Sequence, residues 1–297
     1  MMRKASSNGI EICYDTFGDR KGRPLILIMG LATQMVAWPE PFCRMLAAAG
    51  HFVVRFDNRD VGQSTRMERL YVPDVEALMA ETAAGRQVWV PYTLLDMADD
   101  AVGLMDALKI DQAHVSGLSM GGMIAQVMAL EYPGRLLSLT SIMSTTGEPD
   151  LPPSTPEARE ALLSIPPAKR AGYVSHMAAI YRTFAGGSEF YDEKLQRELS
   201  GKAFDRGIYA PGFLRQFAAI LGAGGRRHRL DQIRIPTLVI HGDCDPVVPL
   251  AHGQDTAAII PGARIEVIPG LGHGTAFPGL WERMAAAIAD HTAAASA

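Results

Sequence analysis

The chain has 297 residues, of which 48% are hydrophobic and 20% are charged, and this composition is that of a globular protein with a sizeable core rather than a disordered chain. Its 28 Lys and Arg stand against 32 Asp and Glu, which gives a net charge of −4 at pH 7, and no basic run appears, so we expect no nucleic-acid partner. The length fits one large α/β domain that carries an insertion.

The cysteines and the N-terminal segment bear on the compartment. Cys13, Cys43 and Cys244 are odd in number and far apart, which fits neither a disulfide framework nor a CxxC metal clip. The first residues, "MMRKASSNGIEICYD", hold no apolar run after their positive charges, and no stretch reaches the roughly 20 apolar residues that span a bilayer. We therefore expect a cytoplasmic protein, monomeric or homodimeric, with no membrane partner and no metal site.

Short apolar runs bounded by Gly, Pro or Asp recur along the chain and predict buried strands. They lie at 24–30, 51–57, 113–117, 136–143, 236–243 and 263–270. Helical patterns lie between them, at 39–50 and at 92–110, where Leu95, Ala98, Val102, Met105 and Leu108 follow three- and four-residue steps. Strands that alternate with helices indicate a parallel sheet covered on both faces.

The alternation stops between about Gly147 and about Arg229. After the proline-rich run "EPDLPPSTP" come helical patterns around 158–163, 171–184 and 213–221. We expect residues 147–229 to form a helical cap inserted into a core made of residues 1–146 and 230–297. The apolar side chains of this cap fit either a pocket lining or the cap's own core; they include Met177, Tyr181, Phe184, Phe204, Phe213 and Phe217.

The run "GLSMG" at 117–121 matches the Gly-x-Ser-x-Gly pattern, in which a strand turns sharply into a helix and presents a serine hydroxyl above the sheet edge. The context agrees, because "AHVS" before it predicts a strand and "GMIAQVMALEYP" after it predicts a helix. Side chains at 117 and 121 would collide with the backbone at so tight a turn. Ser119 is therefore the candidate nucleophile.

A serine hydroxyl needs a base, and the base needs a carboxylate that orients it. After this kind of turn the chain order is serine, acid, histidine, each later residue following a strand. Asp243 ends the run at 236–243 and Asp245 follows it by two residues, so spacing alone does not separate them. His273 follows the next strand between two glycines, whereas His252 lies at a predicted helix start and His291 at the end of the last helix, where we expect a solvated side chain.

Two backbone N–H groups are expected to hold the oxyanion that forms during acyl transfer. One belongs to Met120, the residue after the nucleophile, and the other to the loop "IMGLATQMVAW". Gly30 lets this loop come close, so Leu31 is the candidate second donor. We also expect substrate contacts from Gly30, Trp38, Met143, Tyr181 and Phe217.

With these residues in place, the chain resembles the α/β-hydrolase superfamily from about residue 9 to about residue 290. "GDCDPVVP" is similar to the family's Gly-x-x-Asp-x-Val-Val-Pro motif, in which the later aspartate is the acid, and this selects Asp245. "GLGHG" is similar to its Gly-x-Gly-His motif and selects His273. The resemblance implies an α/β-hydrolase fold, with a mostly parallel eight-stranded sheet, helices on both faces and a helical cap after strand 6.

A second run, "RFDNRDVGQST", resembles the family's scaffold segment Asp-x-Arg-Gly-x-Gly-x-Ser, which has no catalytic role. The chain departs from the family twice. The usual His-Gly before the oxyanion residue is Met29-Gly30, and the usual Arg-Gly of the scaffold is Arg59-Asp60. "MGL" and "DNRDVG" together are similar to a subgroup of capped esterases that includes the aclacinomycin methylesterases.

These residues predict a serine carboxylic ester hydrolase that acts on a small-molecule ester through an acyl-enzyme intermediate and needs no cofactor. Two alternatives keep the same three residues, namely an enol-lactone hydrolase and a cofactor-free haloperoxidase or perhydrolase. A third belongs to another class, a non-catalytic protein that binds a ligand on a hydrolase fold. Fold-level analogy does not choose the substrate.

Overall fold

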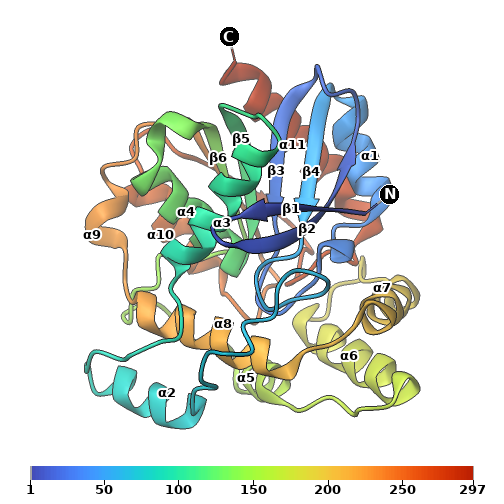
Figure 1. Cartoon of the computed structure of the whole chain (residues 1–297), viewed down its shortest axis with the longest axis vertical. Helices are drawn as coiled ribbons and strands as arrows, with labels where there is room; N and C mark the ends of the chain where they lie inside the picture. The colour runs from blue at the N-terminus through green and yellow to red at the C-terminus, as the bar shows by residue number, and fades with distance from the viewer. Residues whose placement is uncertain (1, 297) are drawn as a thin grey trace.

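The computed structural model describes residues 2–296, and the apolar runs of the sequence build a single sheet within them (Figure 1). Its eight strands lie in the order β1-β2-β4-β3-β5-β6-β7-β8. The bounds are β1 Arg3–Ser7, β2 Ile10–Phe17, β3 Arg23–Ile28, β4 His51–Phe56, β5 Ala113–Leu118, β6 Leu136–Ile142, β7 Thr237–Gly242 and β8 Arg264–Ile268. β3 to β8 pair in parallel, while β1 and β2 form an antiparallel edge. The mostly parallel, eight-stranded sheet that the sequence predicts is confirmed.

Alternate residues of each central strand face two different cores, which is why these strands read as unbroken apolar runs. In β3, Ile26 and Ile28 join the cluster under α3 (Leu94–Ala107) and α4 (Met120–Glu131). Leu25 and Leu27 join the opposite cluster, under α1 (Glu40–Ala48) and α11 (Trp281–Ala294). α10 (Leu250–Ile259) covers the α4 side near β7 and β8. The sheet is therefore sandwiched between two helical layers.

Five helices connect β6 to β7, where the sequence predicts the cap. They are α5 Pro156–Leu163, α6 Arg170–Phe184, α7 Glu193–Arg206, α8 Ala210–Ala223 and α9 Arg227–Leu230. α5 to α8 lie below the carboxyl ends of the strands in Figure 1. The division into a cap at 147–229 and a core elsewhere stays a prediction. The structure shows the helices of this segment, but this does not establish that they form a separate domain.

Besides the four-residue α9, two helices were not predicted, and both bury faces that carry no apolar stripe. α7 buries Gln196, Leu199 and Ser200, so most of its length shows no periodic pattern of apolar residues that would predict a helix. α2 (Val75–Ala83) buries only Val75, yet it packs against α8 and stands beside the cap in Figure 1. The helices that lie opposite the sheet therefore include α2, which lies outside residues 147–229.

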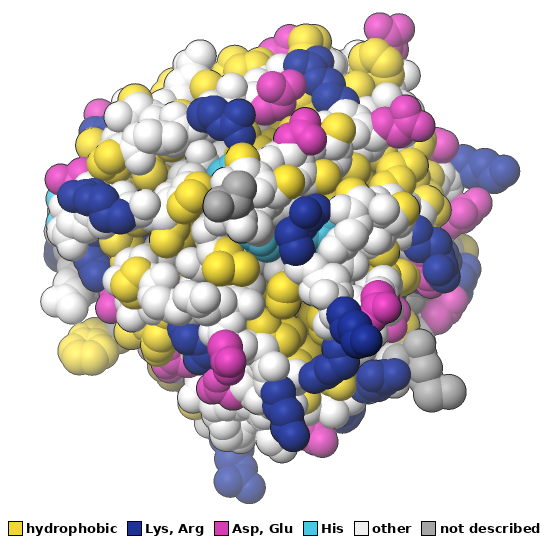
Figure 2. Space-filling model, turned by 90° about the horizontal axis from the view of Figure 1, so that it is seen from above, with side chains coloured by type: hydrophobic (Ala, Val, Ile, Leu, Met, Phe, Trp, Pro, Cys, Tyr) yellow, Lys and Arg dark blue, Asp and Glu magenta, His cyan; other side chains and the backbone are white. Residues whose placement is uncertain are grey.

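The surface seen from above carries acidic and basic side chains intermingled (Figure 2). This agrees with the small net charge of −4. In the part of the chain that the structure describes, no helix is long and apolar enough to cross a membrane.

Three buried histidines lie where the central strands meet α11; His51 and His291 link a strand to this helix, and His114 links β5 to β6. Nε2 of His51 lies 2.7 Å from the Thr292 hydroxyl, Nδ1 of His114 lies 2.8 Å from the Ser138 hydroxyl, and Nε2 of His291 lies 3.1 Å from a backbone carbonyl. Burial lowers the pKa of all three, and for His114 burial and the repulsion that a proton on His114 would meet from neighbouring basic groups lower the pKa to about 4. The native state therefore favours neutral rings at this junction.

Acid should weaken the fold at this junction. Because the folded-state pKa values lie below the ordinary value of about 6.5, the unfolded chain binds protons first as the pH falls below about 6.5. Stability is then fully present above that pH and is lost progressively toward pH 4. Thermal unfolding followed by circular dichroism should show a melting temperature several degrees lower at pH 5 than at pH 7. His114→Gln should reduce that difference, and an unchanged difference would contradict the role of His114.

Candidate active site

Ser119 stands at a sharp turn between the end of β5 and the start of α4. Its backbone has φ 56° and ψ −120°, a conformation that a residue with a side chain adopts only under strain, at a cost of about 1–3 kcal/mol. The flanking glycines make the turn possible. A Cβ on Gly117 would lie 2.0 Å from the Gly121 carbonyl oxygen, and one on Gly121 would lie 2.2 Å from the Ile28 carbonyl oxygen. The sequence expectation for these glycines is met by the geometry.

The imidazole of His273 bridges the serine and a buried carboxylate. Its Nε2 lies 3.0 Å from Ser119 Oγ, and its Nδ1 lies 2.7 Å from Asp245 Oδ2. The backbone N–H of His273 also donates to the backbone carbonyl of Phe184, at the end of α6, at 2.8 Å. The Phe184 ring packs edge-on against the imidazole, with 6.1 Å between the ring centroids. A serine, a histidine and an acid thus lie in one hydrogen-bonded chain, held on one side by a helix of the β6–β7 connection.

The structure brings Asp245, and not Asp243, to the histidine. The Asp245 side chain is fully buried, and its Oδ1 accepts the N–H groups of Val247 at 2.9 Å and Val248 at 2.8 Å. With the His273 contact, three donors compensate the desolvation of this carboxylate. Asp243 is exposed, and its Oδ1 accepts the Gly270 N–H at 2.7 Å. The contacts therefore favour Asp245 over Asp243, and its role as the acid stays a prediction.

A second histidine beneath this carboxylate was missed by the sequence analysis. His241, on β7, is buried, and its Nε2 lies 3.8 Å from Asp245 Oδ2. That nitrogen donates to the Val248 carbonyl at 2.7 Å, and burial lowers the pKa of His241. A neutral ring whose proton is engaged by Val248 supports the acid loop without competing with His273. Its position at the end of a predicted strand was the only sequence signal.

The candidate oxyanion donors face the serine from two sides. Met120 is the first residue of α4, and Leu31 follows Gly30 in the loop after β3. A Cβ on Gly30 would lie 3.1 Å from Ser119 Cβ, so glycine allows the loop to come this close. Within residues 2–296 neither the Leu31 N–H nor the Met120 N–H donates a hydrogen bond. Both donors are thus unengaged next to the nucleophile.

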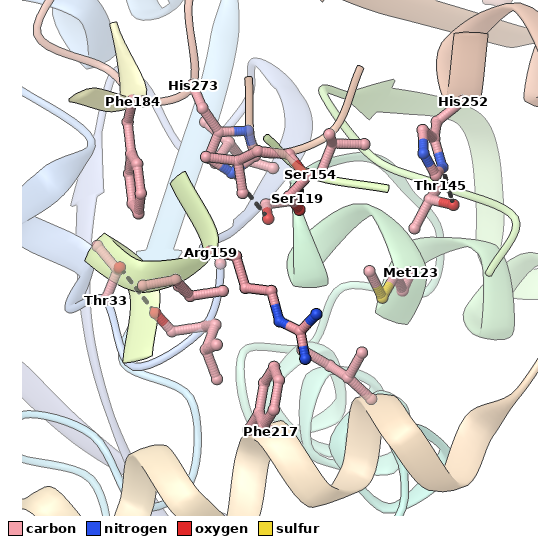
Figure 3. A pocket seen from close by; sticks show the side chains of 18 of the residues that line it. Thr33, Ser119, Met123, Thr145, Ser154, Arg159, Phe184, Phe217, His252 and His273 are labelled. Atoms are coloured by element: carbon pink, nitrogen blue, oxygen red, sulfur yellow. Dashed lines mark hydrogen bonds between the residues drawn. The ribbon is translucent and has the colours of Figure 1, made fainter. Parts of the chain in front are cut away.

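A cavity of about 470 Å³ opens over Ser119 and His273 (Figure 3). Its walls are mostly apolar and come from the β3 loop, α4, α5, α6, α8 and Met79 of α2. Gly30, Tyr181 and Phe217, three of the predicted substrate contacts, line it. Arg159 of α5 also lines it, and Figure 3 shows its side chain between Ser119 and Phe217. The cavity can enclose a largely apolar small molecule above the nucleophile.

Trp38 and Met143, two of the predicted substrate contacts, do not line this cavity. Among the described residues that line the cavity neither appears, and both side chains are fully buried. Trp38 stacks on Phe42 of α1 at 5.8 Å between ring centroids, because the short helical turn before it rotates the indole into the core. Met143 instead accepts the Gly274 N–H on its sulfur at 3.2 Å, beside His273. Met143 therefore supports the loop that carries His273, through Gly274.

The other two late histidines have structural contacts. His291 is only 3% exposed, so the expectation of a solvated side chain is wrong; α11 turns this face onto the sheet. His252 lines the cavity, and its two nitrogens lie 2.7 Å from the Thr145 hydroxyl and 2.8 Å from the Pro152 carbonyl (Figure 3). It ties α10 to the proline-rich segment. Among residues 2–296 no group of three or more His, Cys, Asp or Glu side chains could hold a metal.

Comparisons with known proteins give one family model and several similar chains. Residues 23–280 match the family model described as alpha/beta hydrolase fold. Rhodomycin D methylesterase DauP of Streptomyces sp. (strain C5) is 30% identical, and DnrP of Streptomyces peucetius, of the same name, is 29% identical; each match covers 99% of both chains. Among solved structures, the meta-cleavage product hydrolase CumD of Pseudomonas fluorescens IP01 is similar with a TM-score of 0.76 at 22% identity, covering 99% of this chain and 98% of that one.

Proposed function

The chain belongs to the alpha/beta hydrolase fold family and is an ester-hydrolysing enzyme, and from that premise we propose that it is a serine carboxylic ester hydrolase with the triad Ser119, His273 and Asp245. The single observation that carries the proposal is the hydrogen-bonded chain from Ser119 Oγ through the imidazole to the buried Asp245 carboxylate. Each role follows from where the atoms lie.

Acylation starts at Ser119. His273 Nε2, 3.0 Å from Oγ, takes the hydroxyl proton as Oγ attacks the ester carbonyl carbon. Asp245 accepts a hydrogen bond from the Nδ1–H of His273 at 2.7 Å, which keeps Nε2 free of a proton in the resting state and stabilises the imidazolium that forms. The carbonyl oxygen becomes an oxyanion that the Leu31 and Met120 N–H groups hold. Removing one such donor typically costs about 3 kcal/mol of transition-state stabilisation.

The tetrahedral intermediate collapses when His273 gives its proton to the departing alkoxide. The alcohol leaves, and the acyl group stays on Ser119 as an ester. A water molecule then attacks the acyl carbon while His273 takes one of its protons, and collapse of the second intermediate returns that proton to Ser119 Oγ. The products are a carboxylic acid and an alcohol, and no cofactor enters the balance.

We propose that the substrate has a bulky, mostly apolar acyl part and a small alcohol. The apolar walls and the volume of about 470 Å³ support the first feature. The two relatives whose names are rhodomycin D methylesterase support the second. A monomer or homodimer in the cytoplasm stays a prediction, as do the enol-lactone hydrolase, the perhydrolase and the ligand-binding protein on the same fold.

A fluorophosphonate probe tests the nucleophile. Because His273 activates the Ser119 hydroxyl, the probe should modify Ser119 and abolish ester hydrolysis with one equivalent bound. Mass spectrometry of the peptide that contains Ser119 measures this. Prior heating, which unfolds the triad, should prevent labelling. A folded protein that stays unmodified would support the ligand-binding alternative instead.

The reaction class needs a substrate panel. Hydrolysis rates should be compared across p-nitrophenyl esters of increasing acyl length, methyl esters of apolar acids, and lactones. We expect methyl and p-nitrophenyl esters to be hydrolysed faster than lactones. A marked preference for enol-lactones, or halogenation that requires peroxide, would replace the esterase assignment while keeping the triad.

A further inference from the structure

The loop that carries the Leu31 N–H lacks the brace that its family pattern supplies. Met29 stands where that pattern has histidine, and it is 1% exposed within the core cluster that includes Leu25 and Leu27. A methionine side chain has no N–H or O–H group, so it cannot donate a hydrogen bond to the loop as a histidine could. A different group must therefore fix the direction in which the Leu31 N–H points.

The peptide that joins Leu31 to Ala32 is held at both of its polar ends. Thr33 Oγ1 donates to the Leu31 carbonyl at 2.9 Å, and the Ala32 N–H donates to Gln216 Oε1 at 2.7 Å. Ala32 has φ 51°, in the left-handed region that disfavours a residue with a side chain. The hydrogen bond to Gln216 therefore holds a strained residue directly after the oxyanion donor.

Gln216 lies on α8 and is fully buried, with each end of its amide engaged. Its Oε1 accepts from Ala32, and its Nε2 donates to the Arg59 carbonyl at 2.8 Å. A primary amide satisfied at both ends has one orientation only. The side chain thus links α8, the oxyanion loop and the scaffold segment after β4.

α8 itself is seated firmly on that scaffold segment. Nε of Arg215 lies 3.3 Å from Asp60 Oδ2, and both side chains are at most 1% exposed. A Cβ on Gly212 would lie 2.2 Å from the Asp60 carbonyl oxygen, so the two backbones are in close contact. Asp60 also accepts the Tyr92 hydroxyl at 2.9 Å. The departure from glycine at position 60 therefore supplies the anchor for the helix that carries Gln216.

We propose that Gln216 is a positioning residue that aims the Leu31 N–H at the oxyanion, so that the oxyanion hole is complete only while α8 is docked. The inference rests on the proposed function. The helices between β6 and β7 then do two things: they line the cavity, and through Gln216 they orient an oxyanion donor. Because Gln216 does not touch the substrate, its effect should fall on the transition state and not on ground-state binding.

Gln216→Met tests this, because methionine has a similar length and shape but cannot accept the Ala32 N–H. We expect kcat for a p-nitrophenyl ester to fall about tenfold or more, a part of the 10²–10³-fold that one oxyanion donor contributes, with KM within about twofold. A trifluoromethyl ketone, which forms an oxyanion adduct with the serine, should lose affinity by the same factor. The matching methyl ketone should bind both proteins equally.

Gln126→Met is the matched control, because Gln126 is equally buried and also links the core to the β6–β7 connection. Its side-chain oxygen, on α4, accepts hydrogen bonds from Arg226 at 3.2 Å. It should keep kcat within about twofold, whatever it does to the melting temperature. If Gln216→Met does not fold, Gln216→Asn, one methylene too short to reach both partners, should show the same loss. A folded Gln216 variant with unchanged kcat, or an equal loss in Gln126→Met, overturns the positioning role. Activity retained by Ser119→Ala would overturn the proposed function instead.

Discussion

Ser119→Ala should lower kcat/KM for p-nitrophenyl esters by about 10⁴-fold or more while leaving the fold intact. The hydroxyl makes no cap hydrogen bond to α4, although Ser119 is the residue before that helix, and its side-chain contact is with His273. Removing it therefore takes away the nucleophile and little of the stability. The measurement is steady-state kinetics together with a thermal unfolding curve of each protein.

A serine on β5, the strand that leads to Ser119, provides the control for Ser119→Ala. Ser116 is fully buried, and within the described residues its hydroxyl has no hydrogen-bond partner. Ser116→Ala removes the same atom three residues earlier in β5, and we expect its activity to stay within about twofold of the parent. Full activity in Ser119→Ala, or an equal loss in both variants, would mean that Ser119 is not the nucleophile.

Asp245→Asn should lower kcat by about 10³- to 10⁴-fold, the scale that loss of the correct imidazole tautomer produces. The Val247 and Val248 N–H groups require an acceptor at Oδ1, so the introduced amide must turn its oxygen toward them and its NH₂ toward His273. Nδ1 then becomes an acceptor, and the ring proton moves to Nε2. A protonated Nε2 cannot take the proton of Ser119.

Asp243→Asn is the matched control for the acid. Asp243 is two residues away and exposed, and its contact with the Gly270 N–H survives the change to an amide oxygen. We expect its kcat to stay within about threefold of the parent, measured over the same range of pH. The reverse order of effects would transfer the role of the acid to Asp243 and would contradict the contacts of His273.

The features that sequence patterns predict here are those set by local chemistry. The central strands of the parallel sheet are buried on both faces, so they appear as mostly apolar runs, and six of the eight strands were located within two residues. The turn at Ser119 needs glycines on both sides, so it has a local pattern too. Chain order placed His273, and the resemblance chose between the two aspartates.

The features that patterns missed depend on contacts between distant segments. Gln216 meets Ala32 across 184 residues, and a lone glutamine on an amphipathic helix carries no sign of such a partner. α2 and α7 bury few apolar side chains, so no hydrophobic stripe marks them. Trp38 was assigned to the cavity from its place in the oxyanion loop, but the rotation of one short turn buries it in the core.

The acyl-enzyme is the central claim, and trapping it is the most direct test. The protein should be mixed with a p-nitrophenyl ester, quenched in acid within the first turnover, digested and analysed by mass spectrometry. The proposed mechanism predicts a burst of p-nitrophenolate equal to the enzyme concentration and an acyl group on Ser119. Hydrolysis that proceeds with no burst and no acyl group on Ser119 would contradict it.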